Sequence, residues 1–99
     1  MILKIHRAEG KSIIALSDDS LAGKKFEENG LQLDLSADFY RGEKATEQEI
    51  IDAAGKAYTV NIVGKESISF AVKKGMIEKG RVREIAGIPY AYCLIMRED

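Results

Sequence analysis

Several residue types are scarce in this 99-residue chain, and each scarcity excludes a class of protein. Cys93 is the only cysteine, so no disulfide can form within the chain, and a secreted scaffold held by disulfides is excluded. A structural zinc site takes about four cysteine or histidine ligands, and the chain offers two, Cys93 and His6. We therefore expect neither a metal nor a cofactor.

Long apolar runs are missing as well. No run approaches the roughly 18–20 residues that cross a bilayer, and residues 1–7 lack the apolar stretch of a signal peptide. A cytoplasmic location without membrane contact follows by elimination. The composition, 45% hydrophobic and 31% charged, is typical of one folded domain, which we expect to span residues 1–99.

Catalytic residue types are also few. His6 and Cys93 fall in predicted strands near opposite ends of the chain, where neighbouring strands would allow a cysteine–histidine pair. A buried thiol and a strand-face imidazole explain the same two residues more simply. Glu49 and Asp52 lie three apart on a predicted helix, and exposed helix surface explains them. The pattern favours a protein that is not an enzyme.

Turn residues and alternation predict two β-hairpins. The first joins residues 2–7 and 12–17 around Gly10, and the second joins residues 24–28 and 31–36 around Asn29-Gly30, a dipeptide that favours the type I′ turn. In the strand of residues 31–36, Leu31, Leu33 and Leu35 would form the face that is buried from water. Between the hairpins, residues 17–20, Asp18 among them, offer oxygen atoms to cap one local helical turn.

The second half alternates between helices and strands. Thr46 and Glu49 form a capping box for a helix, whose apolar face would hold Ile50, Ile51, Ala53, Ala54 and Ala57. Residues 58–63 predict a strand with Tyr58, Val60 and Ile62 on one side, and residues 65–74 predict a second helix that Gly75 ends. Two last strands, 81–86 and 90–96, would flank a break at Pro89. This order predicts an α+β two-layer sandwich with a mostly antiparallel sheet and two main helices.

Positive charge is unevenly distributed. Residues 1–52 carry seven basic and eleven acidic side chains, residues 53–99 carry eight and five, and segment 65–83 alone has a net charge of +4. Such asymmetry indicates a polyanionic partner. Basic groups interleaved with aromatic ones suit single-stranded RNA. The candidate contacts are Lys24, Lys25, Arg41, Lys65, Lys73, Lys74, Lys79, Arg81 and Arg83.

Phosphate binding at a helix start is a further candidate. Gly64-Lys65 would open the second helix, and free amides at a helix N-terminus can receive an anion. The spacing of a phosphate-binding loop is absent, so a plain turn glycine explains Gly64 more simply.

Four short motifs follow one another along the chain, and together they resemble a known family. They are Leu21-x-Gly23-Lys24-x-Phe26, Phe39-Tyr40-x-Gly42, Asn61-x-Val63-Gly64 and Gly87-Ile88-Pro89-x-Ala91. The family consists of small archaeal proteins of about this length that form a conserved domain of unknown function, and the resemblance covers essentially the whole chain. It implies a two-layer sandwich, an archaeal cytoplasmic protein, and a gene of a kind that often lies near those of translation and RNA metabolism.

Within these motifs Asn61 stands out, because a polar side chain inside an apolar strand requires hydrogen-bond partners. We expect it to pin a loop or to face a ligand, and we place Tyr40 and Tyr90 with it as candidate contacts. The leading functional hypothesis is an RNA-binding accessory protein that contacts RNA or a ribonucleoprotein through residues 65–83. The alternatives are a protein–protein adaptor or homodimer, and a small enzyme centred on His6, Cys93 or the Gly64-Lys65 helix start.

Overall fold

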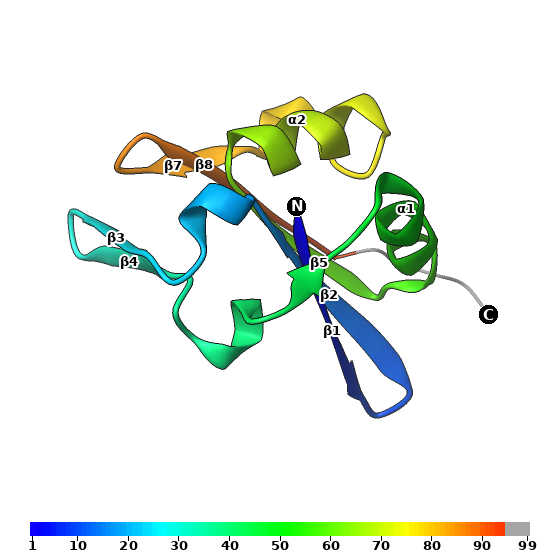
Figure 1. Ribbon diagram of the computed structural model, residues 1–99. Coiled ribbons are helices and arrows are strands. Elements are labelled where there is room, and N and C mark those ends of the chain that lie inside the picture. Colours follow the sequence, from blue (N-terminus) through cyan, green and yellow to red (C-terminus); the bar gives the residue numbers. More distant parts are fainter. Residues whose placement is uncertain (95–99) are drawn as a thin grey trace.

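A computed structural model describes residues 1–94 of the chain and shows one main sheet with two helices on one of its faces (Figure 1). The first hairpin is β1 (Ile2–Ala8) and β2 (Lys11–Ser17), as predicted. Strand β6 (Thr59–Val63) runs parallel to β2, and β8 (Ile88–Leu94) runs antiparallel to β6. The short strands β5 (Glu43–Lys44) and β7 (Arg83–Ile85) complete the order β5-β1-β2-β6-β8-β7.

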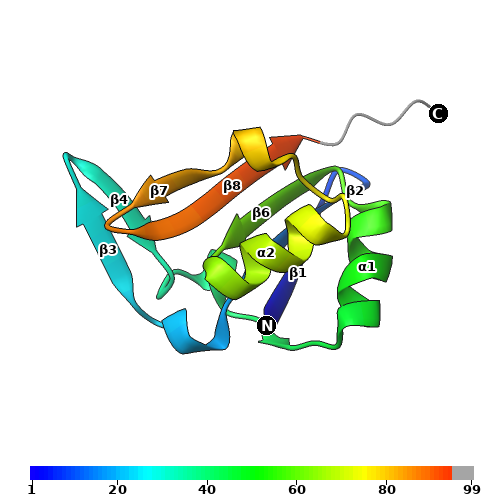
Figure 2. The ribbon, with the colours of Figure 1, turned by 90° about the horizontal axis from the view of Figure 1, so that it is seen from above.

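The helices α1 (Glu47–Lys56) and α2 (Lys65–Lys73) lie together over the middle of this sheet, which Figure 2 shows from above. Between them and the sheet lies the main core, to which β2 contributes Ile14 and Leu16 and β6 contributes Val60 and Ile62, none of them exposed to solvent. The predicted α+β class with a mostly antiparallel sheet is confirmed. No helix within residues 1–94 is long and apolar enough to span a membrane.

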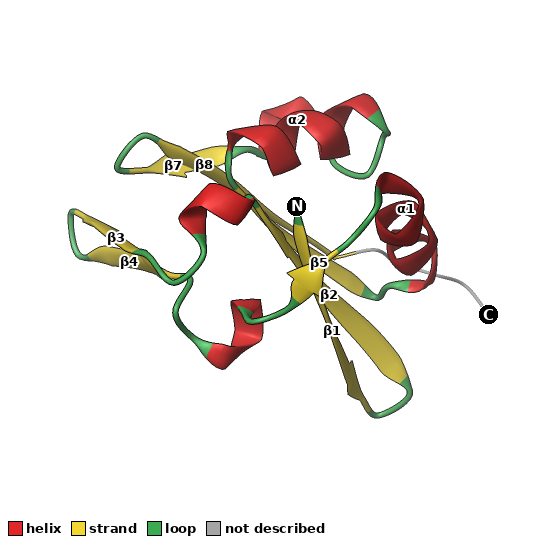
Figure 3. Cartoon of the chain, in the orientation of Figure 1, coloured by secondary structure: helices red, strands yellow, loops and turns green. Residues whose placement is uncertain are grey.

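A second, smaller core lies beside the strands β7 and β8. The hairpin β3 (Lys25–Glu28) and β4 (Leu31–Asp34) forms a separate two-stranded sheet that packs near β7, away from the helices (Figure 3). Its turn residues, Asn29 and Gly30, both have the positive φ that a type I′ turn requires. Leu33 and Leu35 enter this core together with Val63 and Ile85. The 3₁₀ turns η1 (Asp19–Leu21) and η2 (Asp38–Tyr40) flank the hairpin, and η3 (Lys79–Arg81) precedes β7.

Some local predictions were wrong. Leu31, next to the hairpin turn, is 57% exposed and not part of the buried face, and Ile51 lies at the solvent-exposed edge of α1. Tyr58 precedes β6 and lies on the opposite side of the sheet from Val60.

Pro89 does not interrupt the last strand, as the sequence had suggested. The turn lies earlier, at Ala86-Gly87, and Pro89 sits within β8 opposite Glu84. In a two-residue hairpin the pair that closes the turn, here Ile85 and Ile88, exchanges backbone hydrogen bonds, and the next pair does not. Glu84 and Pro89 form that next pair, so the sheet needs no amide proton from the proline. The carbonyl of Pro89 accepts a bond from the Gly64 amide at 2.8 Å. Residues 95 and 96 of the predicted strand lie outside the described residues.

Candidate functional site

Three of the predicted basic residues gather around one groove on the helix side of the molecule. Lys65 and Lys73 come from the two ends of α2, and Lys79 begins η3. The groove has a volume of about 550 Å³. Its other lining residues are Ile68, Ser69, Val72, Val82 and Pro89.

The remaining predicted basic residues lie elsewhere. Lys74 lines a different hollow, beside Met76 and α1. The guanidinium of Arg83 donates to backbone carbonyls of Gly80 and Val82, and Lys24 and Arg81 are exposed outside the groove. Lys25 and Arg41 form ion pairs with Asp34 and Asp38, at 3.8 Å and 3.2 Å. The nine basic residues therefore do not form one surface.

Asn61 lies on the opposite face of the sheet, at a hollow that Phe39 of η2 borders. We call this the helix-free face because α1 and α2 both pack on the other one. On β6 its backbone neighbours across the sheet are Ala15 of β2 and Tyr92 of β8. Since successive strand residues point to opposite faces, Asn61 faces away from the core that holds Val60 and Ile62. The hollow has a volume of about 430 Å³, and its lining comprises Ala8, Glu9, Lys11, Ile13, Phe39, Tyr58, Thr59, Asn61 and Tyr92.

The amide of Asn61 forms no hydrogen bond to any other side chain or backbone group in residues 1–94. It therefore pins no loop among these residues, which was one of the two roles predicted for it. The side chain opposite on β2 is the methyl group of Ala15, which offers no hydrogen-bonding atom. The half-buried amide is left with its two donors and its acceptor directed at the hollow.

Aromatic rings border this amide, and two of them are held in place by neighbours. The rings of Phe39 and His6 are stacked, with centroids 4.7 Å apart and planes at 6°, and His6 Nε2 lies 3.0 Å from the Phe39 carbonyl oxygen. The ammonium group of Lys11 lies 4.3 Å from the centroid of the Tyr58 ring, in a cation–π contact. Tyr92 is 58% exposed, which makes it the freest ring of the hollow.

The other two predicted contacts, Tyr40 and Tyr90, belong to the second core. Both rings pack against its buried residues, and burial raises the pKa of the Tyr40 hydroxyl. Tyr40 also borders a hollow of about 510 Å³, next to Arg41 and Gly42. Neither tyrosine lines the hollow at Asn61.

Reasoning from the sequence missed most of this site. It counted Lys4, Arg7 and Lys11 within an acidic half of the chain, although the β1–β2 hairpin that carries them has Glu9 as its only acidic residue. None of these three cations forms an ion pair within the described residues. Charge summed over each strand, instead of each half of the chain, would have revealed this basic hairpin.

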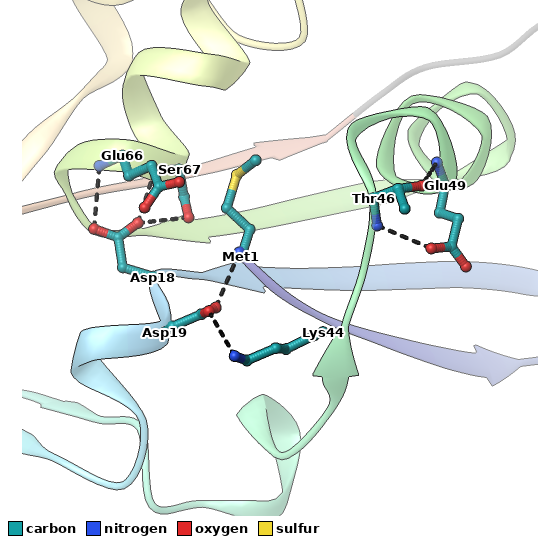
Figure 4. A network of polar contacts seen from close by, with 8 residues as sticks. All are labelled: Met1, Asp18, Asp19, Lys44, Thr46, Glu49, Glu66 and Ser67. Carbon is teal, nitrogen blue, oxygen red and sulfur yellow. Dashed lines mark hydrogen bonds and ion pairs between the residues drawn. The ribbon is translucent and has the colours of Figure 1, made fainter.

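The start of α2, predicted as a candidate anion site, is filled by the protein itself (Figure 4). Asp18, 7% exposed, accepts bonds from the Glu66 amide at 3.1 Å and from the Ser67 amide and hydroxyl at 2.7 Å each. This corrects the sequence prediction, which had Asp18 capping the adjacent turn. The side chain makes no bond to η1, because it turns to a helix 48 residues further along the chain.

Gly64 is the residue that allows this approach. Its φ is 110°, and a methyl group on its Cα would collide with the Asp18 carboxylate. A neighbouring acid has a separate role, since Asp19 binds the terminal amino group of Met1 at 2.9 Å and Lys44 at 3.6 Å. Those contacts lower the pKa of Asp19, with the bond to the terminal ammonium as the main cause.

The structure separates the residues of the proposed cysteine–histidine pair. His6 is on β1 and Cys93 on β8, with β2 and β6 between them. Three strand spacings make about 14 Å, and Cys93 packs toward the helix-side core whereas His6 stacks on Phe39. No direct contact between thiol and imidazole can form in this fold.

The carboxylates of α1 have structural partners. Glu49 and Thr46 form the predicted capping box, with bonds of 2.9 Å and 3.1 Å (Figure 4). Asp52 accepts a bond from the Gln48 side chain at 2.9 Å. Within residues 1–94, no three histidine, cysteine, aspartate or glutamate side chains gather into a group that could hold a metal ion.

Comparisons with other proteins agree with the fold. The crystal structure of an uncharacterized conserved protein from the archaeon Methanopyrus kandleri superposes with a TM-score of 0.81 at 24% sequence identity, covering 99% of this chain and 94% of that one. No curated protein matches the chain. The sequence profile of a family described as "Protein of unknown function (DUF424)" matches residues 6–96. The chain belongs to this DUF424 family.

Proposed function

We propose that this protein is a cytoplasmic, non-enzymatic accessory of RNA metabolism or translation, and that it binds single-stranded RNA on the helix-free face of its sheet. The observation that carries the proposal is the unpartnered amide of Asn61 in a hollow bordered by Phe39, Tyr58 and Tyr92. The link to translation rests on the family resemblance of the four sequence motifs. The RNA contact rests on the geometry of the hollow.

The aromatic rings suit unstacked bases. Single-stranded RNA is recognised by stacking its splayed bases on aromatic side chains and by hydrogen bonds to their polar edges. Tyr92 offers an accessible ring, and the volume of about 430 Å³ falls within the roughly 300–1,000 Å³ of small-ligand sites. The Asn61 amide can both donate to and accept from a base edge, as a carboxylate or an ammonium group cannot.

The β1–β2 hairpin supplies charge for the phosphates. Lys11 lines the hollow and Lys4 shares the helix-free face, whereas Arg7, three residues after Lys4 on β1, points to the other face. Backbone binding by such cations releases counterions, so affinity must fall as salt rises. Cations at the groove lined by Lys65 and Lys73 lie on the helix side and are not part of this site.

Fluorescence anisotropy with fluorescein-labelled 10-nucleotide RNAs at two salt concentrations tests the proposal. Base–aromatic stacking is worth about 1–3 kcal/mol per base, so Tyr92→Ala should weaken binding by roughly 5- to 150-fold, and Asn61→Ala should also weaken it. Leu31→Ala is the matched control, because Leu31 is 57% exposed and lies on the other hairpin. Unchanged affinity in both Tyr92→Ala and Asn61→Ala, or no salt-dependent binding by the wild type, would refute the proposed function.

A further inference from the structure

A second surface of the molecule is independent of the hollow at Asn61 and calls for a different partner. It is the groove between α2 and the segment from η3 to β8, which we call the lysine groove and define by the residues Lys65, Ile68, Ser69, Val72, Lys73, Lys79, Val82 and Pro89. We propose that the lysine groove docks an acidic, amphipathic helical segment of a partner protein. The proposal does not depend on RNA binding.

The floor of the groove is aliphatic. Val72 and Val82 are half-buried, and Ile68 and Pro89 below them are buried, so the apolar surface is preformed. None of the eight lining residues carries an aromatic ring. Bases therefore have no stacking surface here, whereas leucine or isoleucine side chains would fill the space and remove apolar surface from water.

The rim of the groove is positively charged. Lys65, Lys73 and Lys79 are exposed, and within the described residues no acid lies within ion-pairing distance of any of them. Glu66 and Glu78, the acids next to them in the sequence, line no part of the groove. Lysine stems can lie along an apolar floor while their ammonium groups stay in water. Charge complementarity therefore selects an acidic partner over a basic or neutral one.

The geometry of α2 fits a helix as the occupant. Residues 65, 68, 69, 72 and 73 follow the i, i+3, i+4, i+7, i+8 spacing of a single helix stripe. Lys65 and Lys73 are eight residues apart, which is about 12 Å along the axis and just over two turns. An amphipathic helix that places apolar residues one turn apart can lie in such a groove with acidic residues toward both ends of the rim.

The two surfaces lie on opposite faces of the sheet. Pro89 of the lysine groove and Tyr92 of the hollow are three residues apart on β8 and so point to opposite sides. A partner protein and a nucleic acid would therefore not compete for the same atoms.

The test uses a fluorescein-labelled 18-residue peptide with leucine at positions 4, 8, 11 and 15 and mostly glutamate elsewhere, together with a permuted peptide of identical composition. NMR of ¹⁵N-labelled protein reports which amides shift, and anisotropy gives the affinity. We expect shifts at Ile68, Ser69, Val72 and Lys79 with the patterned peptide, and weaker binding of the permuted one. Lys73→Glu should weaken binding by about tenfold, because like charges then face each other.

Lys74→Glu is the matched control. It makes the same charge change one residue further along, at a lysine that lines a different hollow, and should bind the patterned peptide like the wild type. Val72→Asp, a charge in the floor, gives a second variant, with circular dichroism confirming its fold. Any one of four results would overturn the proposal. They are equal weakening by Lys73→Glu and Lys74→Glu, equal binding of both peptides, absence of shifts at the groove, and occupation of the groove by an RNA oligomer or an anionic vesicle instead.

Discussion

The buried carboxylate of Asp18 gives the sharpest prediction about stability. Asp18→Ala removes the acceptor of three hydrogen bonds at the start of α2, two from backbone amides and one from the Ser67 hydroxyl. Loss of an ordinary N-cap costs about 1–2 kcal/mol. Here Ser67 is fully buried, so its amide and hydroxyl lose their acceptor without access to water, which adds about 1–3 kcal/mol.

Together these effects lower the free energy of unfolding by about 2–5 kcal/mol, a large part of the roughly 5–15 kcal/mol of a typical domain. For a domain of this size 1 kcal/mol shifts Tm by about 4–8 °C, so Tm should fall by roughly 8–40 °C. Asp18→Asn retains one oxygen acceptor and should lose about half as much. Thermal and urea unfolding followed by circular dichroism measure both quantities, and the urea midpoint should fall with an unchanged m-value.

Asp19→Ala is the control for this prediction. It removes a neighbouring aspartate whose ion pairs, to Met1 and Lys44, are partly exposed, and its effect should be much smaller. A double-mutant cycle with Ser67→Ala isolates the bond between the two side chains, since Ser67→Ala should be less harmful when Asp18 is already alanine. Equal Tm values for Asp18→Ala and Asp19→Ala would contradict the view that the long-range cap holds α2 in place.

Two further predictions concern a substitution at Gly64 and the effect of Asp34 on stability at low pH. Gly64→Ala should destabilise the fold at least as strongly as Asp18→Ala, because its methyl group collides with the Asp18 carboxylate at a φ of 110°. In a protein that already carries Asp18→Ala, Gly64→Ala should be less harmful. Additive losses of stability in urea unfolding would count against the collision. The pKa of Asp34 is lowered by bonds from Ser36 and by Lys25, so its stabilising contribution is present above the unfolded pKa and is lost as pH falls through the lower folded value. Asp34→Asn should therefore flatten the decline of Tm below about pH 4, and an unchanged acid profile would show that these contacts add nothing.

The short-range features of the fold could be predicted from the sequence. Asn29-Gly30 specifies its turn because a type I′ turn requires a positive φ at both central positions, which Asn and Gly tolerate best. Thr46 and Glu49 each accept a hydrogen bond from the other's backbone amide within one helical turn. These interactions join residues at most a few positions apart, so composition and spacing are sufficient to predict them. The alternation of apolar residues likewise predicted the first hairpin and the mixed α+β class.

The tertiary structure decided everything that depends on residues far apart in the chain. The sequence cannot show that Asp18 reaches α2 rather than its own turn, since only the parallel pairing of β2 with β6 brings the end of β2 beside Gly64. The same pairing places Ala15 beside Asn61, and β8 adds Tyr92, which creates the hollow. Parallel strands must be joined by a long crossover, and the packing that fixes their register is a property of the whole core. For that reason the cations of residues 65–83, which belong to one short segment of the sequence, are divided among different surfaces once the chain folds.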